Sequence, residues 1–279
     1  MDGMRRSRSL IFPCISSRSS PMQIIKIGGS LLFEQQQSVA LALANRRKKM
    51  LVIIGYGPRL RALGRLHGIP ERRLQKMSGG AVRVTDDVTA AASYFASSIE
   101  MNRLLEALQA QNVRCSGVYG SQGFIWGERP ARARYWDEGV LKSFDGDFSG
   151  RITKIATDAI EKELEEVECL VISPMLRDTL SGRLLICDAD YAAVEIANAL
   201  GAESLTIVTD VPGFKVDGEV VHGVAAEEID QHIETATGGM KKKLAFIKSG
   251  LQRKLRKVVV GDATLLSDDA PQSLGTTFQ

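Results

Sequence analysis

The sequence predicts an α/β protein, a three-layer sandwich in which a mainly parallel open sheet lies between layers of helices. From Met22 onward, short runs rich in β-branched residues alternate with longer segments of helical periodicity, the pattern of repeated βα units. At 279 residues the chain exceeds the usual size of a single core, so we expect two lobes that share one sheet. The composition agrees with a globular protein, because 44% of the residues are apolar and 25% are charged.

Six apolar runs are predicted as strands of this sheet: 23–27, 50–54, 115–119, 169–173, 205–208 and 257–260. The longest helical segment covers 85–109, and an aspartate in its first turn favours a helix start there. Its periodicity predicts a buried helix with an apolar face made of Val88, Ala92, Phe95 and Ile99.

Two further segments are predicted as β-structure outside the main sheet. Residues 123–150 lack helical periodicity and carry aromatic residues between Gly, Pro and Asp, which indicates a β-ribbon insertion. Residues 214–221 are predicted as a hairpin, because Asp217-Gly218 suits a type I′ turn with positive φ at both central positions.

Charge and residue usage exclude several classes of function. The net charge is only +3 and aromatic residues make up 6%, so neither nucleic acid nor a membrane is expected as a partner. The four cysteines form no CxxC pair and the three histidines have no ligand spacing, so we expect no metal site built by the protein. A small-molecule substrate and a cytoplasmic location fit best.

The ends of the chain differ from the rest. Residues 1–21 are rich in Arg and Ser and almost free of acids, which predicts either a disordered leader or a start codon assigned too far upstream. A genuine leader of this kind would indicate an organelle. Residues 268–279 are expected to form a tail.

A glycine loop follows the first predicted strand, where Gly28 and Gly29 come directly after Lys26 and Ile27. Two glycines let backbone N–H groups approach an anion, and the next helix adds the positive end of its dipole. The loop is therefore a candidate phosphate cradle, although two glycines at a strand end more often form only a tight turn. The chain contains no GxxxxGK[ST] motif, which disfavours a P-loop nucleoside triphosphatase.

Three other places carry candidate site residues. The second strand ends in Gly55-Tyr56-Gly57, but Leu60 stands where a dinucleotide fingerprint needs its third glycine. Asp188 and Asp190 stand at a helix entrance, where they can cap the helix, orient cationic side chains or approach Mg²⁺. Further along, Gly238-Gly239 precede Met240 and a run of three lysines that ends at Lys243.

Taken in this order, these motifs resemble those of the amino acid kinase family, and most closely those of the acetylglutamate kinases. The resemblance covers about residues 22–262, and its most specific stretches are KIGGS at 26–30, GAVRVTD at 80–86, Glu100-Met101-Asn102, DADYAA at 188–193, TDVPG at 209–213 and GGMKKK at 238–243. It implies the carbamate kinase-like fold, with an acceptor and dimerisation lobe at 22–200 and a nucleotide lobe at 201–267.

The resemblance implies transfer of a phosphoryl group from ATP, with Mg²⁺ bound with the nucleotide, to the side-chain carboxylate of N-acetyl-L-glutamate in arginine biosynthesis. Lys26 and Lys243 would stabilise the transferred group from its two sides, and Asp190 would hold both ammonium groups. A carboxylate acceptor is already ionised at pH 7, so no general base is needed.

By the same resemblance, Arg83 would pair with the α-carboxylate of the acceptor. The backbone of Gly28, Gly29, Gly55 and Gly57 would receive the phosphates and the reacting carboxylate. The nucleotide pocket would be lined by Thr209, Asp210 and Gly213.

Departures from the acetylglutamate kinase pattern lie on the acceptor side. Tyr56 stands in place of a glycine, and Ile186 replaces an asparagine that donates a hydrogen bond to substrate. Asp188 matches related kinases that act on glutamate or aminoadipate attached to a small carrier protein, whereas the VRVTD segment matches the acetylglutamate type. The alternatives are therefore a kinase for an acceptor on a small acidic carrier protein, or a non-catalytic regulatory subunit of this fold. The family also implies a homodimer.

Overall fold

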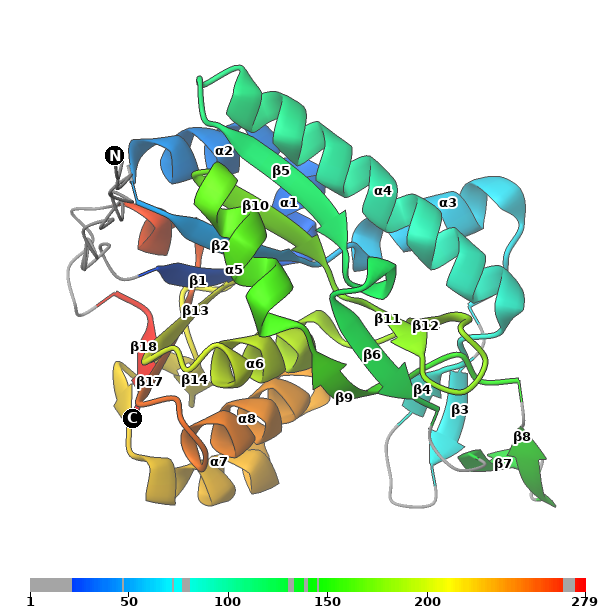
Figure 1. Cartoon of the computed structure of the whole chain (residues 1–279). Helices are drawn as coiled ribbons and strands as arrows, with labels where there is room; N and C mark the ends of the chain where they lie inside the picture. Colours follow the sequence, from blue (N-terminus) through cyan, green and yellow to red (C-terminus); the bar gives the residue numbers. More distant parts are fainter. Residues whose placement is uncertain are drawn as a thin grey trace, which may run out of the picture.

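The computed structural model describes residues 22–46, 48–71, 73–76, 81–129, 133–137, 140–144, 146–267 and 274–279. Its main sheet has eight strands in the order β16-β18-β17-β13-β1-β2-β10-β5 (Figure 1). Neighbouring strands are parallel except β17 and β18. In sheet order, the strands are Gly223–Val224, Thr276–Phe278, Lys257–Gly261, Ser204–Val208, Gln23–Ile27, Met50–Ile54, Cys169–Ser173 and Cys115–Tyr119. The predicted mainly parallel sheet is confirmed.

The central strands are buried on both faces, which explains their continuous apolar sequences. Every residue of β2 and of β10 is buried. All six strands expected from the sequence are present, and only two boundaries differ, because β13 begins one residue earlier at Ser204 and β17 ends one residue later at Gly261.

Helices cover both faces of the sheet and complete the three layers. On one face, α1 (Gly29–Glu34), α2 (Gln36–Asn45) and α4 (Asp87–Gln109) share a core with alternate residues of the central strands. The other face carries α5 (Thr157–Glu166), α6 (Ala189–Ala199) and α8 (Gly238–Leu251). Two more helices extend these layers, since α3 (Gly57–His67) packs on α4 and α7 (Ile229–Thr235) packs on α8.

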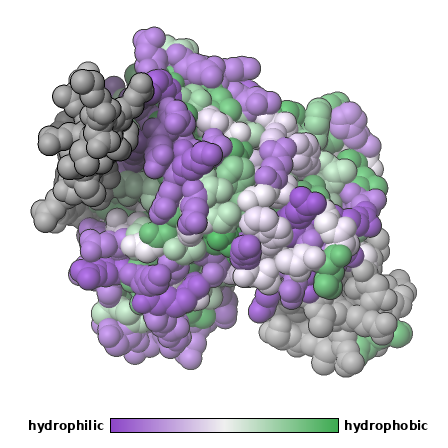
Figure 2. All heavy atoms as spheres, viewed as in Figure 1, coloured by the Kyte–Doolittle hydropathy of each residue, from purple (hydrophilic) through white to green (hydrophobic). Residues whose placement is uncertain are grey.

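Helix α4 is present as expected, but the expected orientation of its apolar face is wrong. Asp86 caps the helix by accepting a hydrogen bond from the backbone N–H of Thr89 at 2.8 Å. Val88 and Phe95 are each 58% exposed, whereas Ser93, Ser97 and Glu100 are completely buried. The buried face of α4 is thus partly polar, and two of these side chains have partners there: the hydroxyls of Ser97 and Ser173 are 2.6 Å apart, and Glu100 pairs with Arg59. Figure 2 shows hydrophobic and hydrophilic residues interspersed over this helix.

Smaller sheets project from the carboxyl edge of the main sheet. The segment 123–150 contributes β-strands as predicted, in two four-stranded sheets of order β12-β11-β6-β9 and β4-β3-β7-β8. Their strands in chain order are Arg73–Lys76, Ala81–Arg83, Ile125–Glu128, Ala133–Asp137, Val140–Phe144, Arg151–Ile155, Met175–Asp178 and Leu184–Ile186. The hairpin of β14 (Lys215–Val216) and β15 (Glu219–Val220) is confirmed, and Asp217 and Gly218 have φ values of 51° and 90°.

The end of the chain is part of the main sheet, although the sequence was expected to end in a tail. Strand β18 pairs with β17 and β16, and the backbone of Gln279 bonds to that of Val224 and Ala226. The expected leader at 1–21 lies outside the described residues. No helix in the described ranges is both long enough and apolar enough to cross a membrane.

Three short 3₁₀ helices, Gly120–Gln122, Ala226–Glu228 and Ala263–Leu266, complete the described elements. The sheet runs without a break from β5 to β16, and β13 pairs directly with β1. Residues on either side of position 200 therefore share one sheet, as expected for two lobes. The lobe boundary itself stays a prediction.

Candidate functional site

The two glycine loops lie side by side at the carboxyl edge of the sheet, because β1 and β2 are parallel neighbours. Gly28 follows β1, Gly55 follows β2, and the N–H of Gly55 donates to the carbonyl of Ile27 at 2.9 Å. A Cβ added to Gly29 would lie 3.0 Å from the amide nitrogen of Gly57, closer than such contacts normally come. Only glycine fits at this position, so the two loops pack tightly against each other where α1 and α3 begin. Backbone N–H groups at such helix N-termini can bind an anion.

A compact charge cluster, which we call the lysine triad, is formed by Lys26, Asp190 and Lys243. The Nζ atom of Lys26 lies 2.7 Å from Oδ1 of Asp190, and Lys243 donates a hydrogen bond to Oδ2 of the same carboxylate. The three residues come from β1, α6 and α8, and both lysines are buried. One carboxylate thus fixes two ammonium groups beside the glycine loops, with a net charge of +1.

The electrostatics of the lysine triad keep Asp190 ionised. Burial alone would raise the pKa of Asp190, but its ion pairs with Lys26 and Lys243 outweigh burial and lower the pKa to about 2. Burial and the neighbouring charge of Lys26 lower the pKa of Lys243. The arrangement suits stabilisation of a phosphoryl group that gathers negative charge.

Ile186 and Asp188 precede Asp190, the carboxylate of the triad, in the chain. Asp188 is the N-cap of α6, and its Oδ1 accepts a hydrogen bond from the N–H of Asp190 at 2.9 Å. This cap fixes the helix turn that carries Asp190. Ile186 ends β12, and its backbone bonds to Phe148 and Gly150.

Tyr56 fills the position between the two glycines of the second loop. The residue is only 7% exposed, and burial raises the pKa of its hydroxyl, with Cys187 and Asp188 acting in the same direction and Arg83 against it. The Tyr56 side chain belongs to a hydrophobic core cluster that also contains Leu60 and Ile186. The Tyr56 side chain therefore takes up space there that a glycine would leave open.

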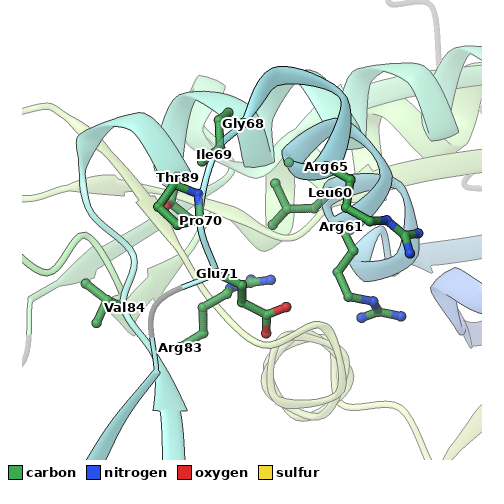
Figure 3. A pocket seen from close by; sticks show the side chains of 11 residues that line it. Leu60, Arg61, Arg65, Gly68, Ile69, Pro70, Glu71, Arg83, Val84 and Thr89 are labelled. Carbon is green, nitrogen blue, oxygen red and sulfur yellow. The ribbon is translucent and has the colours of Figure 1, made fainter.

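Arg83 lies where two cavities meet. The larger, of about 820 Å³, is lined by Arg83, Ile186 and Asp188 and continues along α6 and α8 to Tyr191, Glu195, Phe246 and Ser249; we call it the acceptor groove. The smaller, of about 550 Å³, lies between α3 and the loop at 68–71 (Figure 3). In Figure 3 the side chains of Arg83 and Glu71 lie next to each other, facing Arg61 across the cavity.

The acceptor groove is basic. Its lining contains Arg61, Arg73, Arg83, Arg151 and Lys242 against Glu71, Asp188 and Glu195. Two of the acids are already neutralised, because Glu71 pairs with Arg73 and Glu195 pairs with both terminal nitrogens of Arg253.

With respect to the part of the chain that the structure describes, Arg61, Arg83, Arg151 and Lys242 form no ion pair. The Nε atom of Arg83 is buried and likewise lacks a described hydrogen-bond partner. The groove therefore offers several cations to an acidic ligand.

The segment expected at the nucleotide begins next to the first glycine loop, since an added Cβ on Gly28 would lie 3.4 Å from Cα of Thr209. Thr209 follows β13, and its hydroxyl donates to the carboxylate of Asp210 at 3.1 Å, while its N–H donates to Gly261. Gly213 packs closely against the C-terminal strand, since an added Cβ would lie 2.8 Å from the hydroxyl of Thr276. Within the described residues, no group of three or more acidic, His or Cys side chains could hold a metal ion.

The structure thus brings the sequence-derived candidates together in two sets, the triad with the glycine loops and the acceptor groove with Arg83, Ile186 and Asp188. The triad and the glycines do not line the groove itself. Sequence reasoning missed Arg61, Arg151 and Tyr191 of the groove. The repeated arginines at 59, 61 and 65 could have signalled a basic helix face, but not which cavity that face lines.

Comparison with known proteins shows the family of the chain. The profile described as "Amino acid kinase family" matches residues 21–262. A relative from Pyrobaculum islandicum, named putative [LysW]-aminoadipate/[LysW]-glutamate kinase, is 30% identical over 239 residues, which cover 83% of this chain and 90% of the relative.

Two solved structures share the fold. N-acetylglutamate synthase from Neisseria gonorrhoeae, complexed with coenzyme A and L-arginine, matches with a TM-score of 0.76 at 20% identity, covering 93% of this chain and 61% of that one. Carbamate kinase from Giardia lamblia, bound to citric acid, matches with a TM-score of 0.63 at 16% identity, covering 92% of this chain and 98% of that one.

Proposed function

Because the chain belongs to the amino acid kinase family, we propose that it phosphorylates the side-chain carboxylate of glutamate or aminoadipate whose amino group is attached to a small acidic carrier protein. ATP is the phosphoryl donor, and Mg²⁺ arrives with the nucleotide. The observation that carries the proposal is the length and charge of the acceptor groove. The name of the Pyrobaculum islandicum relative supports the same acceptor class.

The groove continues beyond Arg83, Ile186 and Asp188, the residues expected at the amino acid. It extends along α8 to Ser249, which is about 9 Å along the helix axis from Lys243. A peptide chain attached to the acceptor can occupy this length. The cations of the groove favour an acidic partner, because complementary charge speeds encounter and selects against basic proteins.

The lysine triad supports the chemical step in this proposal. In this proposal Lys26 acts from the acceptor side and Lys243 from the nucleotide side, and Asp190, which pairs with both, keeps the two ammonium groups in place. The negative charge of the transferred group is then stabilised without reorganisation of the site. The acceptor attacks as a carboxylate, so this step needs no general base.

Residues around the lysine triad would bind the two substrates. Phosphate oxygens would accept hydrogen bonds from the loop of Gly28 and Gly29, whose tight fit is that of a backbone cradle. Arg83 would pair with the α-carboxylate of the amino acid, since its Nε has no described partner. The base and ribose of ATP would lie against the segment from Thr209 to Gly213. Mg²⁺ would be held mainly by phosphates and water.

N-acetyl-L-glutamate is the second candidate acceptor, which would place the protein in arginine biosynthesis. The segment 82–86 favours it, because it matches the acetylglutamate type and contributes Arg83 and Thr85 to the lining of the groove. The intact lysine triad argues against a non-catalytic regulatory subunit, since a binding protein has no need for two buried lysines on one carboxylate.

The test is ATP-dependent acyl phosphate formation, measured by trapping with hydroxylamine. Acceptors are N-acetyl-L-glutamate, N-acetylaminoadipate, and glutamate or aminoadipate joined to the C-terminus of an acidic carrier domain. Turnover at least tenfold more efficient with the carrier-linked acceptors supports the proposal. Equal or better turnover with N-acetyl-L-glutamate would replace it by the second candidate.

We also propose a homodimer, as the family implies. The exposed apolar side chains of Val88 and Phe95 on α4 are consistent with a contact between two copies. Light scattering should give about twice the mass of 30.4 kDa. Replacement of both residues by serine should lower that mass, and a monomeric wild type would contradict the expectation.

A further inference from the structure

A buried ion pair lies beside the glycine loops and has no part in the chemistry proposed above. Glu100 of α4 is completely buried, and its Oε1 accepts a hydrogen bond from Nε of Arg59 at 2.7 Å. Its second oxygen, Oε2, is buried without a hydrogen-bond partner among the described residues. Burying a charge in this way is costly, and such pairs are weak evidence for stability alone.

Arg59 connects three helices through a single side chain. It belongs to the first turn of α3, its guanidinium lies over the ring of Phe33 on α1 at 4.5 Å from the centroid, and it pairs with Glu100 on α4. A cation in the first turn is opposed by the helix dipole, and the buried carboxylate offsets this. The pair therefore fixes where α3 begins relative to α1 and α4.

Helices α1 and α3 begin at the two glycine loops, α1 at Gly29 and α3 at Gly57. A Cβ on Gly29 would lie 2.9 Å from Cδ of Pro58, the residue before Arg59, so the first turn of α3 touches the first loop directly. Gly55 is equally close to that loop, since its added Cβ would lie 2.8 Å from the amide nitrogen of Gly29. A shift of α3 would therefore displace both loops.

We propose that Glu100, acting through Arg59, is a positioning residue that holds the two glycine loops in the relative geometry needed for phosphoryl transfer. The inference rests on the proposed function, in which one loop receives phosphate and the other the reacting carboxylate. Transfer requires donor and acceptor to lie in line, and small misplacements are costly in rate.

The experiment compares two changes with a matched control. Glu100→Gln retains the size and one acceptor oxygen but removes the charge. The double variant Arg59→Met with Glu100→Met replaces the pair by apolar side chains of similar length, which commonly preserves stability. The control is Glu168→Gln, which removes an exposed carboxylate paired with Arg114 at the opposite edge of the sheet.

The double variant should keep a melting temperature within about 5 °C of wild type, because replacing a buried ion pair by apolar side chains of similar size commonly preserves stability. Its kcat should fall roughly 10- to 100-fold, with the KM for ATP nearly unchanged. Glu100→Gln should show a smaller fall in kcat of the same kind, and Glu168→Gln should show none. Wild-type kcat in a stably folded double variant would mean that the pair is only structural and would overturn the inference.

Hydrogen exchange separates this inference from the proposed function, because it needs no turnover. In both Glu100 variants, amides at 28–34 and 57–67 should exchange faster than in wild type, while amides at 243–251 on α8 should not change. If wild type turns over no acceptor, the proposed function fails, and the exchange result alone decides the positioning role. Unchanged exchange at both loops would overturn it. If the double variant does not fold, Glu100→Gln supplies both readouts.

Discussion

The lysine triad and the acceptor groove lie next to each other, but the charges of the triad are paired whereas most cations of the groove are not. In the triad, two buried lysines share one carboxylate, and the ion pairs lower the pKa of that carboxylate to about 2. In the groove, Arg61, Arg83, Arg151 and Lys242 have no ion-pair partner among the described residues, and the groove is open.

The difference indicates two separate tasks. Charges that are buried and mutually fixed act at short range and are screened little by salt, which suits stabilisation of a transition state. Cations left without partners at an open surface attract an acidic ligand from solution and are screened strongly. Variants of the two regions should therefore fail in different ways.

The largest effect is expected from Asp190→Asn. The amide cannot hold two ammonium groups, so turnover should fall by at least roughly 10³-fold for every acceptor. Loss of one partner in a buried pair should also cost about 3–5 kcal/mol of stability, measured by urea unfolding. Asp230→Asn is the control, because it removes one partner of the exposed pair with Lys248 and should leave turnover unchanged. Turnover retained in Asp190→Asn would exclude the triad from the chemistry.

Arg83→Lys should have the next largest effect. Lysine keeps the charge but loses the planar pair of donors, so kcat/KM should fall roughly 10- to 100-fold, in line with one lost hydrogen bond between charged groups. The fall should be similar for carrier-linked and free acceptors, because both present the same α-carboxylate. If kcat/KM falls only for the carrier-linked acceptor, Arg83 contacts the carrier instead. Steady-state kinetics with both acceptors distinguish these outcomes.

The two regions also differ in how far they could be predicted. Lys26 lies in β1, Asp190 in the first turn of α6 and Lys243 in the second turn of α8. These residues are far apart in sequence, and the expectation that they meet came from the resemblance to the amino acid kinases. The groove could not be found this way. Its walls come from α3, β4, α6 and α8, and which face of each helix lines it depends on packing.

Helix α4 shows the same limit most clearly. Its length and its cap at Asp86 follow from the sequence. Periodicity predicted a buried apolar face, but the buried face includes Ser93, Ser97 and Glu100, and Phe95 is exposed. Hydrogen bonds and the ion pair with Arg59 decide that orientation, and those partners lie on other elements.

Acid should weaken the triad by protonating Asp190. The pKa of Asp190 is lower in the folded protein than the ordinary value of 3.8, so the unfolded chain binds more protons between pH 4 and pH 2. The stabilisation is complete above pH 4 and is lost as the pH falls toward 2, by about 2 kcal/mol in total. Urea unfolding of wild type and Asp190→Asn from pH 5 to pH 2.5 measures it. A stability gap between the two proteins that does not narrow with acid would contradict the pKa shift.

The smallest effect, and the one most specific to the groove, is expected from the double variant Arg61→Gln with Arg151→Gln. These residues line the groove without lying in the triad, so kcat/KM for a carrier-linked acceptor should fall about tenfold at low salt, chiefly through slower association. The deficit should shrink as salt is raised, because wild type loses the same attraction by screening. N-acetyl-L-glutamate should be turned over as by wild type.

Arg256→Gln is the matched control for charge, since Arg256 is exposed and pairs with Glu203 at the opposite edge of the sheet. This variant should leave kcat/KM unchanged for both acceptors, which separates a local effect of the groove from a change in net charge. A salt-independent deficit for both acceptors in the double variant would mean that Arg61 and Arg151 act in binding the amino acid itself. The acceptor groove and the lysine triad would then act on the same part of the substrate, and the two regions would not have separate tasks.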